Sequence, residues 1–147
     1  RELAFRLLFQ LDIGGGAPDE VFAASRVASE ASSEVWIFAT QLARGAWEER
    51  GELDPIIEKY AAGWTLERMA NVDRNLLRLC LYEILKRDDI PPSVSINEAV
   101  EMAKKYSTVD SAKFINGILG AFSREKGATQ GADAKVMAEA DGGVNLP

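Results

Sequence analysis

The sequence contains no histidine and only one cysteine, Cys80. Histidine is the commonest general base and a frequent metal ligand, so its absence removes the simplest basis for catalysis or for a metal centre. No cysteine pair and no carboxylate cluster with metal-ligand spacing replaces it. The run Gly14-Gly15-Gly16 lacks the following Gly-Lys-Ser/Thr of a phosphate-binding loop. We therefore expect no enzyme activity, no cofactor and no bound metal.

Long apolar runs are also missing, and none approaches the roughly 20 residues that a membrane span needs. No secretory signal is visible, and a single cysteine cannot form an internal disulfide, which fits the reducing cytoplasm. Cys80 lies among apolar residues of a helical segment, which favours a buried small hydrophobe over a reactive thiol. These features predict a cytoplasmic protein that does not cross a membrane.

Positive charge is scarce. The 147 residues, enough for one domain with a sizeable core, carry 17 basic and 23 acidic side chains and a formal net charge of −6. This balance argues against a general nucleic-acid binder. The distribution is uneven, however, because residues 1–72 hold 7 basic and 12 acidic side chains, whereas residues 73–126 hold 9 and 8. Any contact with RNA must therefore come from a local patch.

The sequence does contain helical periodicity, and strand-like alternation appears nowhere. The segment Asp73–Arg87 is apolar over more than half of its helical circumference, which predicts a central helix covered on several sides. Asp73 stands at the expected N-cap, and Ser95 opens the capping box of the next helix. Asp54 and Pro55 have the pattern of an N-cap followed by proline at the first helical position. We predict an all-α fold of about seven helices, over residues 1–12, 19–29, 34–50, 55–62, 73–87, 95–106 and 110–122.

The domain division follows the composition. From Ser123 onward the chain turns to Gly, Ala, Ser, Lys and Glu, with few large apolar side chains. Such a segment buries too little surface to fold by itself. We therefore predict a helical domain over residues 1–126 and a polar tail over residues 127–147, in which Asp133–Ala140 has the potential for a short helix.

One polar strip runs along the predicted central helix. Arg74, Arg78, Tyr82 and Lys86 recur every fourth residue, so they lie on one side of it. They form either a solvated edge, whose long side chains extend into water, or a phosphate-facing strip with an aromatic platform.

Two other helix faces carry residues that a core does not require. Phe5 and Phe9 lie opposite the apolar stripe of the first helix, so either a second layer of helices covers them or they form an exposed partner surface. Lys113, Asn116 and Gly120 share a face of the last predicted helix, away from its apolar stripe. The small Gly120 would permit close approach by another backbone.

Several blocks stand in a characteristic order along the chain. They are Asp73-Arg74-Asn75, Tyr82-Glu83-Ile84-Leu85, Ile90-Pro91, Ser95-Ile96-Asn97-Glu98-Ala99-Val100, Ala103-Lys104-Lys105-Tyr106 and Lys113-Phe114-Ile115-Asn116-Gly117-Ile118-Leu119. Together they resemble the NusB family of bacterial transcription antitermination and rRNA-processing factors. The likeness is strong over residues 64–122, fair over residues 1–12 and weak between them.

The resemblance implies an all-helical fold of two packed three-helix bundles. It also implies binding of boxA RNA from rRNA operons as a heterodimer with the ribosomal protein NusE, within the antitermination complex of RNA polymerase. We predict that the RNA contacts are Arg1, Arg6, Arg78, Lys86, Lys113 and Asn116, and that the NusE contacts are Phe9, Glu83 and Gly120. The same partner face could instead pair two copies of the chain as a homodimer.

Two alternatives to this function stay open from the sequence. The N-terminal domain of an rRNA cytosine methyltransferase resembles NusB but continues into a large cofactor-binding α/β domain. A helical adaptor that binds only proteins is the other alternative, and salt-dependent binding of a boxA oligonucleotide separates it from an RNA-binding factor.

Overall fold

The computed structural model describes the backbone of residues 1–140 and the side chains of residues 1–127. Within residues 1–140 the chain forms seven α-helices and no strand, so the all-α prediction is confirmed. The helices are α1 (Glu2–Gly14), α2 (Pro18–Ala28), α3 (Ser33–Glu48), α4 (Arg50–Lys59), α5 (Asn71–Lys86), α6 (Pro92–Tyr106) and α7 (Val109–Ala140), with a short 3-10 helix, η1 (Leu66–Arg68), before α5.

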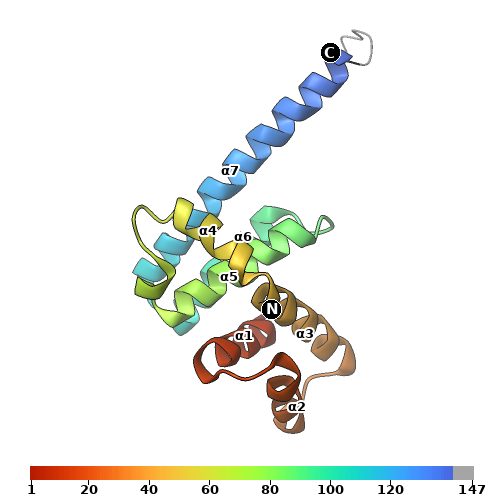
Figure 1. Cartoon of the computed structure of the whole chain (residues 1–147), viewed down its shortest axis with the longest axis vertical. Coiled ribbons are helices and arrows are strands. Elements are labelled where there is room, and N and C mark those ends of the chain that lie inside the picture. The colour runs from red at the N-terminus through yellow and green to blue at the C-terminus, as the bar shows by residue number, and fades with distance from the viewer. Residues whose placement is uncertain (141–147) are drawn as a thin grey trace.

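Helix α5 lies at the centre of the fold (Figure 1). It packs against α1, α3, α4, α6 and α7. Its side chains Leu76, Leu77 and Leu81 are at most 1% exposed, and full burial of each contributes roughly 1.5–3 kcal/mol. The prediction of a central helix covered on several sides is confirmed.

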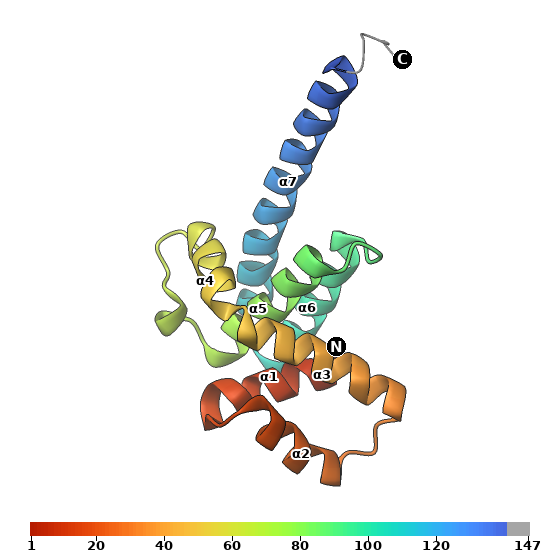
Figure 2. The ribbon, with the colours of Figure 1, turned by 45° about the vertical axis from the view of Figure 1, so that its right-hand side comes forward.

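The other helices form two groups around α5. Helices α1, α2 and α3 pack together, α6 and α7 pack against each other and against α5, and α4 lies against α5 and α3. Figure 2 shows α5, α6 and α7 as one group and α1, α2 and α3 as the other. This arrangement confirms the two packed three-helix bundles that the resemblance implies.

Two predicted helix starts are wrong, because the expected capping side chains bind other helices instead. Helix α5 begins before Asp73, whose Oδ2 accepts a hydrogen bond from Ser111 Oγ of α7 at 3.1 Å. Helix α6 begins at Pro92, which suits a first helical turn because its missing N–H would have no partner there. Ser95 therefore lies inside α6 and donates from Oγ to Glu83 of α5 at 2.8 Å.

The predicted start of α4 is also wrong, since this helix begins at Arg50 and contains Pro55. Asp54, the expected N-cap, accepts two hydrogen bonds from Arg78 of α5, each of 2.8 Å. Proline inside a helix costs about 3 kcal/mol. Leu53 and Ile57 on the same helix are each 1% exposed, and their burial at roughly 1.5–3 kcal/mol each offsets that cost.

Helix α7 continues to Ala140, well beyond the predicted end at Phe122, and extends away from the other helices (Figures 1 and 2). Residues Asp133–Ala140 are helical as expected, but they form the last part of α7 rather than a separate short helix. The division of the chain at residue 126 stays a prediction, and residues 141–147 of the predicted tail lie outside the described residues. Among the described helices, none combines the length and the apolar character that a membrane crossing requires.

Candidate functional site

A surface groove of about 510 Å³ lies between α6 and α7. On each helix the lining residues follow the pattern i, i+3, i+4, i+7 and i+11, so each helix turns one face toward the groove. Helix α6 contributes Ser93, Ile96, Asn97, Val100 and Lys104, and α7 contributes Val109, Ala112, Lys113, Asn116 and Gly120. The groove thus combines an apolar surface with amide and ammonium groups.

The structure brings together three of the residues predicted from the sequence, because Lys113, Asn116 and Gly120 all line this groove. Lys113 and Asn116 are exposed, and neither side chain has a hydrogen bond or ion pair within the part of the chain whose side chains are described. The described lining contains two lysines and no carboxylate, although the chain carries a net charge of −6. The groove is therefore a cationic site on an acidic protein.

Arg1 and Glu83 lie together, with Glu83 inside the fold and Arg1 partly exposed. The Arg1 Nε and Nη2 atoms lie 2.9 and 2.8 Å from Glu83 Oε1, which also accepts the Ser95 bond. The bond to Glu83 raises the pKa of the Arg1 guanidinium. Glu83 is only 2% exposed. It is an interior residue, which corrects the prediction that it lies on the partner surface.

Arg78 is likewise an interior residue. It is 6% exposed, donates to both carboxylate oxygens of Asp54, and has its Nη1 3.5 Å from Asp12 of α1. Arg74 Nε lies 2.6 Å from the same Asp12. These arginines join α5 to α1 and α4, so both the solvated edge and the phosphate-facing strip are wrong for them. Helical periodicity could not predict these ion pairs, because Asp12 and Asp54 lie far from the two arginines in the sequence.

Arg6 and Lys86 keep exposed charges in two separate places. Arg6 donates from Nη2 to Tyr106 Oη at 3.0 Å and lies 3.5 Å from Glu2, whereas Lys86 Nζ lies 3.4 Å from Glu49. The Arg6 and Lys86 side chains are 61% and 47% exposed. Exposed ion pairs are weak, so both cations are available to a phosphate. The predicted RNA contacts are thus dispersed rather than gathered at one point.

The aromatic pair of α1 is mostly covered. Phe5 is 3% exposed, and its ring centroid lies 5.3 Å from that of Tyr106 in α6. Phe9 is partly buried, with its centroid 5.9 Å from that of Phe5. The interpretation that a second layer of helices covers these residues is confirmed for Phe5, and only Phe9 retains an exposed edge.

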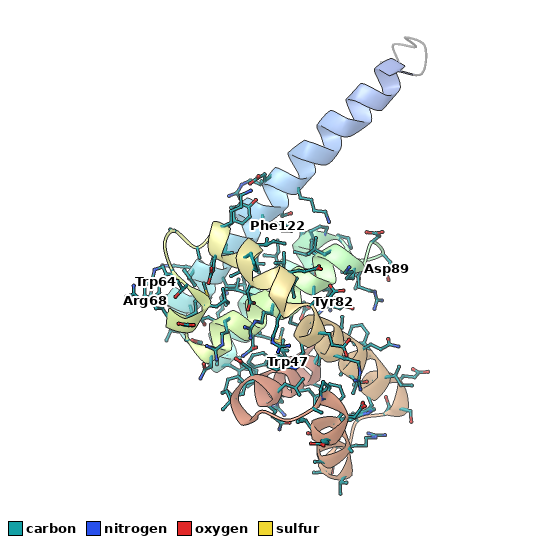
Figure 3. The ribbon with its side chains drawn as sticks, in the orientation of Figure 1. Trp47, Trp64, Arg68, Tyr82, Asp89 and Phe122 are labelled. Atoms are coloured by element: carbon teal, nitrogen blue, oxygen red, sulfur yellow. The ribbon has the colours of Figure 1, made fainter. Side chains whose placement is uncertain are left out.

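A second groove, which the sequence did not reveal, lies beside η1 and the start of α5. It measures about 370 Å³, and its lining includes Trp64, Arg68, Asp73, Ser111 and Phe114. The Trp64 and Phe114 rings meet edge to face with centroids 6.3 Å apart, and Figure 3 shows Trp64 beside Arg68 at the margin of the fold. These aromatic rings give the groove an apolar wall next to charged groups.

Asp73 is the unusual member of this second groove. It is 6% exposed, and its Oδ1 has no hydrogen-bond partner within the described residues. Burial raises the pKa of Asp73, and the hydroxyl groups of Ser111 and Ser107 only partly oppose this. A buried acceptor without a donor is rare in folded proteins. From the sequence, Asp73 was indistinguishable from a helix cap.

Neither groove has the composition of a metal site. Among the described residues, no group of three or more His, Cys, Asp or Glu side chains could hold a metal ion. Cys80 is buried, and burial raises the pKa of its thiol, so it is a small core side chain as predicted.

Comparison with known proteins shows which family this chain is similar to. Residues 1–124 match the model of the NusB family. The transcription antitermination protein NusB of Symbiobacterium thermophilum is 46% identical over 92% of this chain and 94% of its own length. Among solved structures, NusB of T. maritima has a TM-score of 0.75 at 36% identity, covering 84% of this chain and 87% of its own.

A crystal structure of the antitermination factors NusB and NusE in complex with dsRNA also matches, with a TM-score of 0.73 at 30% identity, over 84% of this chain and 92% of the matched chain. The curated relatives carry the name of an antitermination protein, not of an enzyme. The family model covers most of the sequence, and the seven-helix fold is that of the solved relatives. The chain therefore belongs to the NusB family.

Proposed function

We propose that this chain is a transcription antitermination factor that binds boxA RNA of rRNA operons together with NusE. It acts in the cytoplasm, within the antitermination complex of RNA polymerase. Relatives named for antitermination support the first part of this proposal. The solved assembly of NusB, NusE and dsRNA supports RNA and NusE as the two ligands.

The observation that carries the RNA proposal is the groove between α6 and α7, where Lys113 and Asn116 have no intramolecular partner among the described side chains. An unpaired lysine exchanges only water and counterions when it meets a phosphate, so it contributes to binding at little cost. Arg6 and Lys86 extend the RNA contact because their charges remain exposed. Arg1 is anchored by Glu83 and contributes through its remaining exposed edge. Arg78 is left out because it is buried.

The partner proposal rests on two features. Phe9 keeps an exposed apolar edge on α1, and Asp73 offers a buried acceptor next to the Trp64–Phe114 pair. Ribosomal proteins are rich in lysine and arginine, and either side chain would satisfy Asp73 Oδ1. Gly120 is not part of this proposal, because it lines the groove assigned to RNA and a Cβ there would lie 3.1 Å from Arg124 Nη1. A homodimer through Phe9 stays a prediction.

The RNA proposal is tested by the salt dependence of boxA RNA binding. Lys113→Ala should weaken binding and lower the log–log salt slope by about 0.7, the contribution of one phosphate contact in single-stranded RNA. Lys126→Ala is the control, because Lys126 lies on the same helix but outside the groove. Wild-type affinity and slope in Lys113→Ala would remove this groove as the RNA site.

The partner proposal is tested by titration calorimetry with NusE. Phe9→Ala should weaken NusE binding by about 1–3 kcal/mol if Phe9 fills a central pocket of the interface. Val27→Ala is the control, because Val27 is an equally apolar but 89% exposed residue of α2. Unchanged NusE affinity in Phe9→Ala would exclude this edge. NusE binding without any RNA binding would instead favour the protein adaptor.

A further inference from the structure

Besides Ser93, the groove between α6 and α7 contains two polar residues that the proposed RNA contacts do not include. Asn97 and Lys104 lie on the α6 wall, opposite the Asn116 and Lys113 wall of α7. Both are exposed. Lys104 Nζ lies 3.1 Å from Glu101, a pair whose side chains are more than half exposed. Each wall therefore carries one amide and one ammonium group.

The surface between these walls is apolar. Ile96 and Val100 are partly buried, Ala112 is 3% exposed, and Val109 is 62% exposed. An apolar surface flanked by unpaired amides suits a nucleobase, whose faces are apolar and whose edges carry both donors and acceptors. Asparagine can form two hydrogen bonds with a base edge because it carries both a donor and an acceptor. The two lysines suit the phosphates on either side.

We propose that this groove seats one unpaired nucleobase of a single-stranded RNA segment. Asn97 and Asn116 hydrogen-bond to its edge, and Lys104 and Lys113 contact the flanking phosphates. The inference rests on the proposed RNA-binding function and makes it specific, because it assigns base recognition to one place.

The charges favour RNA over a peptide as the occupant. The described lining holds two lysines and no carboxylate, so the groove attracts an anionic ligand on a chain of net charge −6. The second groove has the opposite character, because the buried Asp73 carboxylate there favours a cationic donor. The two ligands of the proposed function therefore have separate sites that match them in charge.

Adjacent lysines provide a matched pair for the first test. Lys104 lines the groove, whereas Lys105 lies outside it, with its Nζ 2.8 Å from Glu2 of α1. Binding of boxA RNA to the chain with NusE present is measured across salt concentrations. Lys104→Gln should lower the log–log slope by about 0.7, and Lys105→Gln should leave it unchanged. Equal slopes in the two variants would overturn the inference.

Base insertion is tested by an abasic scan of the same RNA. One abasic position should weaken wild-type binding by roughly fivefold or more, since the lost contacts include hydrogen bonds worth about that factor. Asn97→Ala should cost a similar factor with intact RNA and nothing further with that abasic RNA. If the loss of affinity from Asn97→Ala adds fully to the loss from an abasic site at every RNA position, Asn97 does not contact a base.

Failure of this inference is distinguishable from failure of the proposed function. If wild type binds boxA RNA and both Asn97→Ala and Lys104→Gln bind equally well, only the base-seating groove is refuted. If these variants lose NusE affinity while keeping RNA affinity, the occupant is a protein and the inference is overturned. If wild type does not bind RNA, both the function and the groove assignment fail.

Discussion

The buried ionic network around Asp12 makes the sharpest prediction about stability. Asp12 of α1 accepts hydrogen bonds from Arg74 Nε at 2.6 Å and from Asn75 Nδ2 at 2.8 Å, and it lies 3.5 Å from Arg78. Its side chain is 12% exposed. Asp12→Ala leaves Arg74 without its carboxylate partner and Arg78 with Asp54 alone.

The expected cost follows from what remains buried. Removing one partner of a buried ion pair costs about 3–5 kcal/mol, because it leaves an uncompensated charge. Arg74 is 18% exposed and Arg78 keeps two bonds to Asp54, so we expect a loss near 3 kcal/mol in the free energy of unfolding, the lower end of that range. Asp89→Ala, which removes the surface partner of Arg87, should have no measurable effect.

Denaturant unfolding monitored by circular dichroism measures both variants. Burial opposes ionisation of Asp12, but the bonds from Arg74 and Asn75 outweigh it and hold its pKa below the ordinary value. The difference in the free energy of unfolding between wild type and Asp12→Asn is therefore largest above about pH 4, the pKa of an unfolded aspartate. It disappears as the pH falls through the pKa of Asp12 in the folded protein. An unfolding free energy of Asp12→Ala within about 0.5 kcal/mol of that of Asp89→Ala would refute the network's role.

Three further substitutions test single sites. A Cβ at Gly45 would overlap the Tyr82 ring, so Gly45→Ala should lower the free energy of unfolding by about 1–3 kcal/mol through overpacking. Gly117→Ala, where a Cβ meets nothing within 4 Å, should raise the free energy of unfolding by about 0.5–1 kcal/mol. Equal changes in the thermal unfolding of the two glycine variants would contradict both predictions. Burial raises the pKa of Asp73, so wild type binds more protons folded than unfolded and loses stability as the pH rises above about 4. The free energy of unfolding of Asp73→Asn should therefore rise relative to that of wild type between pH 4 and pH 7. A difference between the two that stays constant with pH would exclude a desolvated carboxylate at this position.

The central helix and the α7 face were predictable because each depends on local spacing. Leu76, Leu77 and Leu81 lie within one short segment, and their burial follows from the width of the apolar surface. Lys113 and Asn116 stand three residues apart on a helix, so they necessarily share a face. The structure places that face in the groove with α6.

Long-range partners were not predictable. Arg74 and Asp12 are 62 positions apart, and Arg1 and Glu83 are 82 apart. Periodicity places Arg74 and Glu83 on opposite sides of α5, but it gives no sign of which residues of other helices meet them. The same limit made Asp73 look like a cap, because a cap and a buried acceptor have the same side chain at nearly the same helix position.

The most direct test of the function is the affinity of the chain for boxA RNA with and without NusE, beside a scrambled RNA of the same length and composition. Binding should be tighter to boxA than to the scrambled RNA. It should also tighten when NusE is added, because NusE contributes contacts to the same RNA. Equal affinity for the two RNAs, with no change on adding NusE, would contradict the assignment of this chain as a boxA-binding antitermination factor.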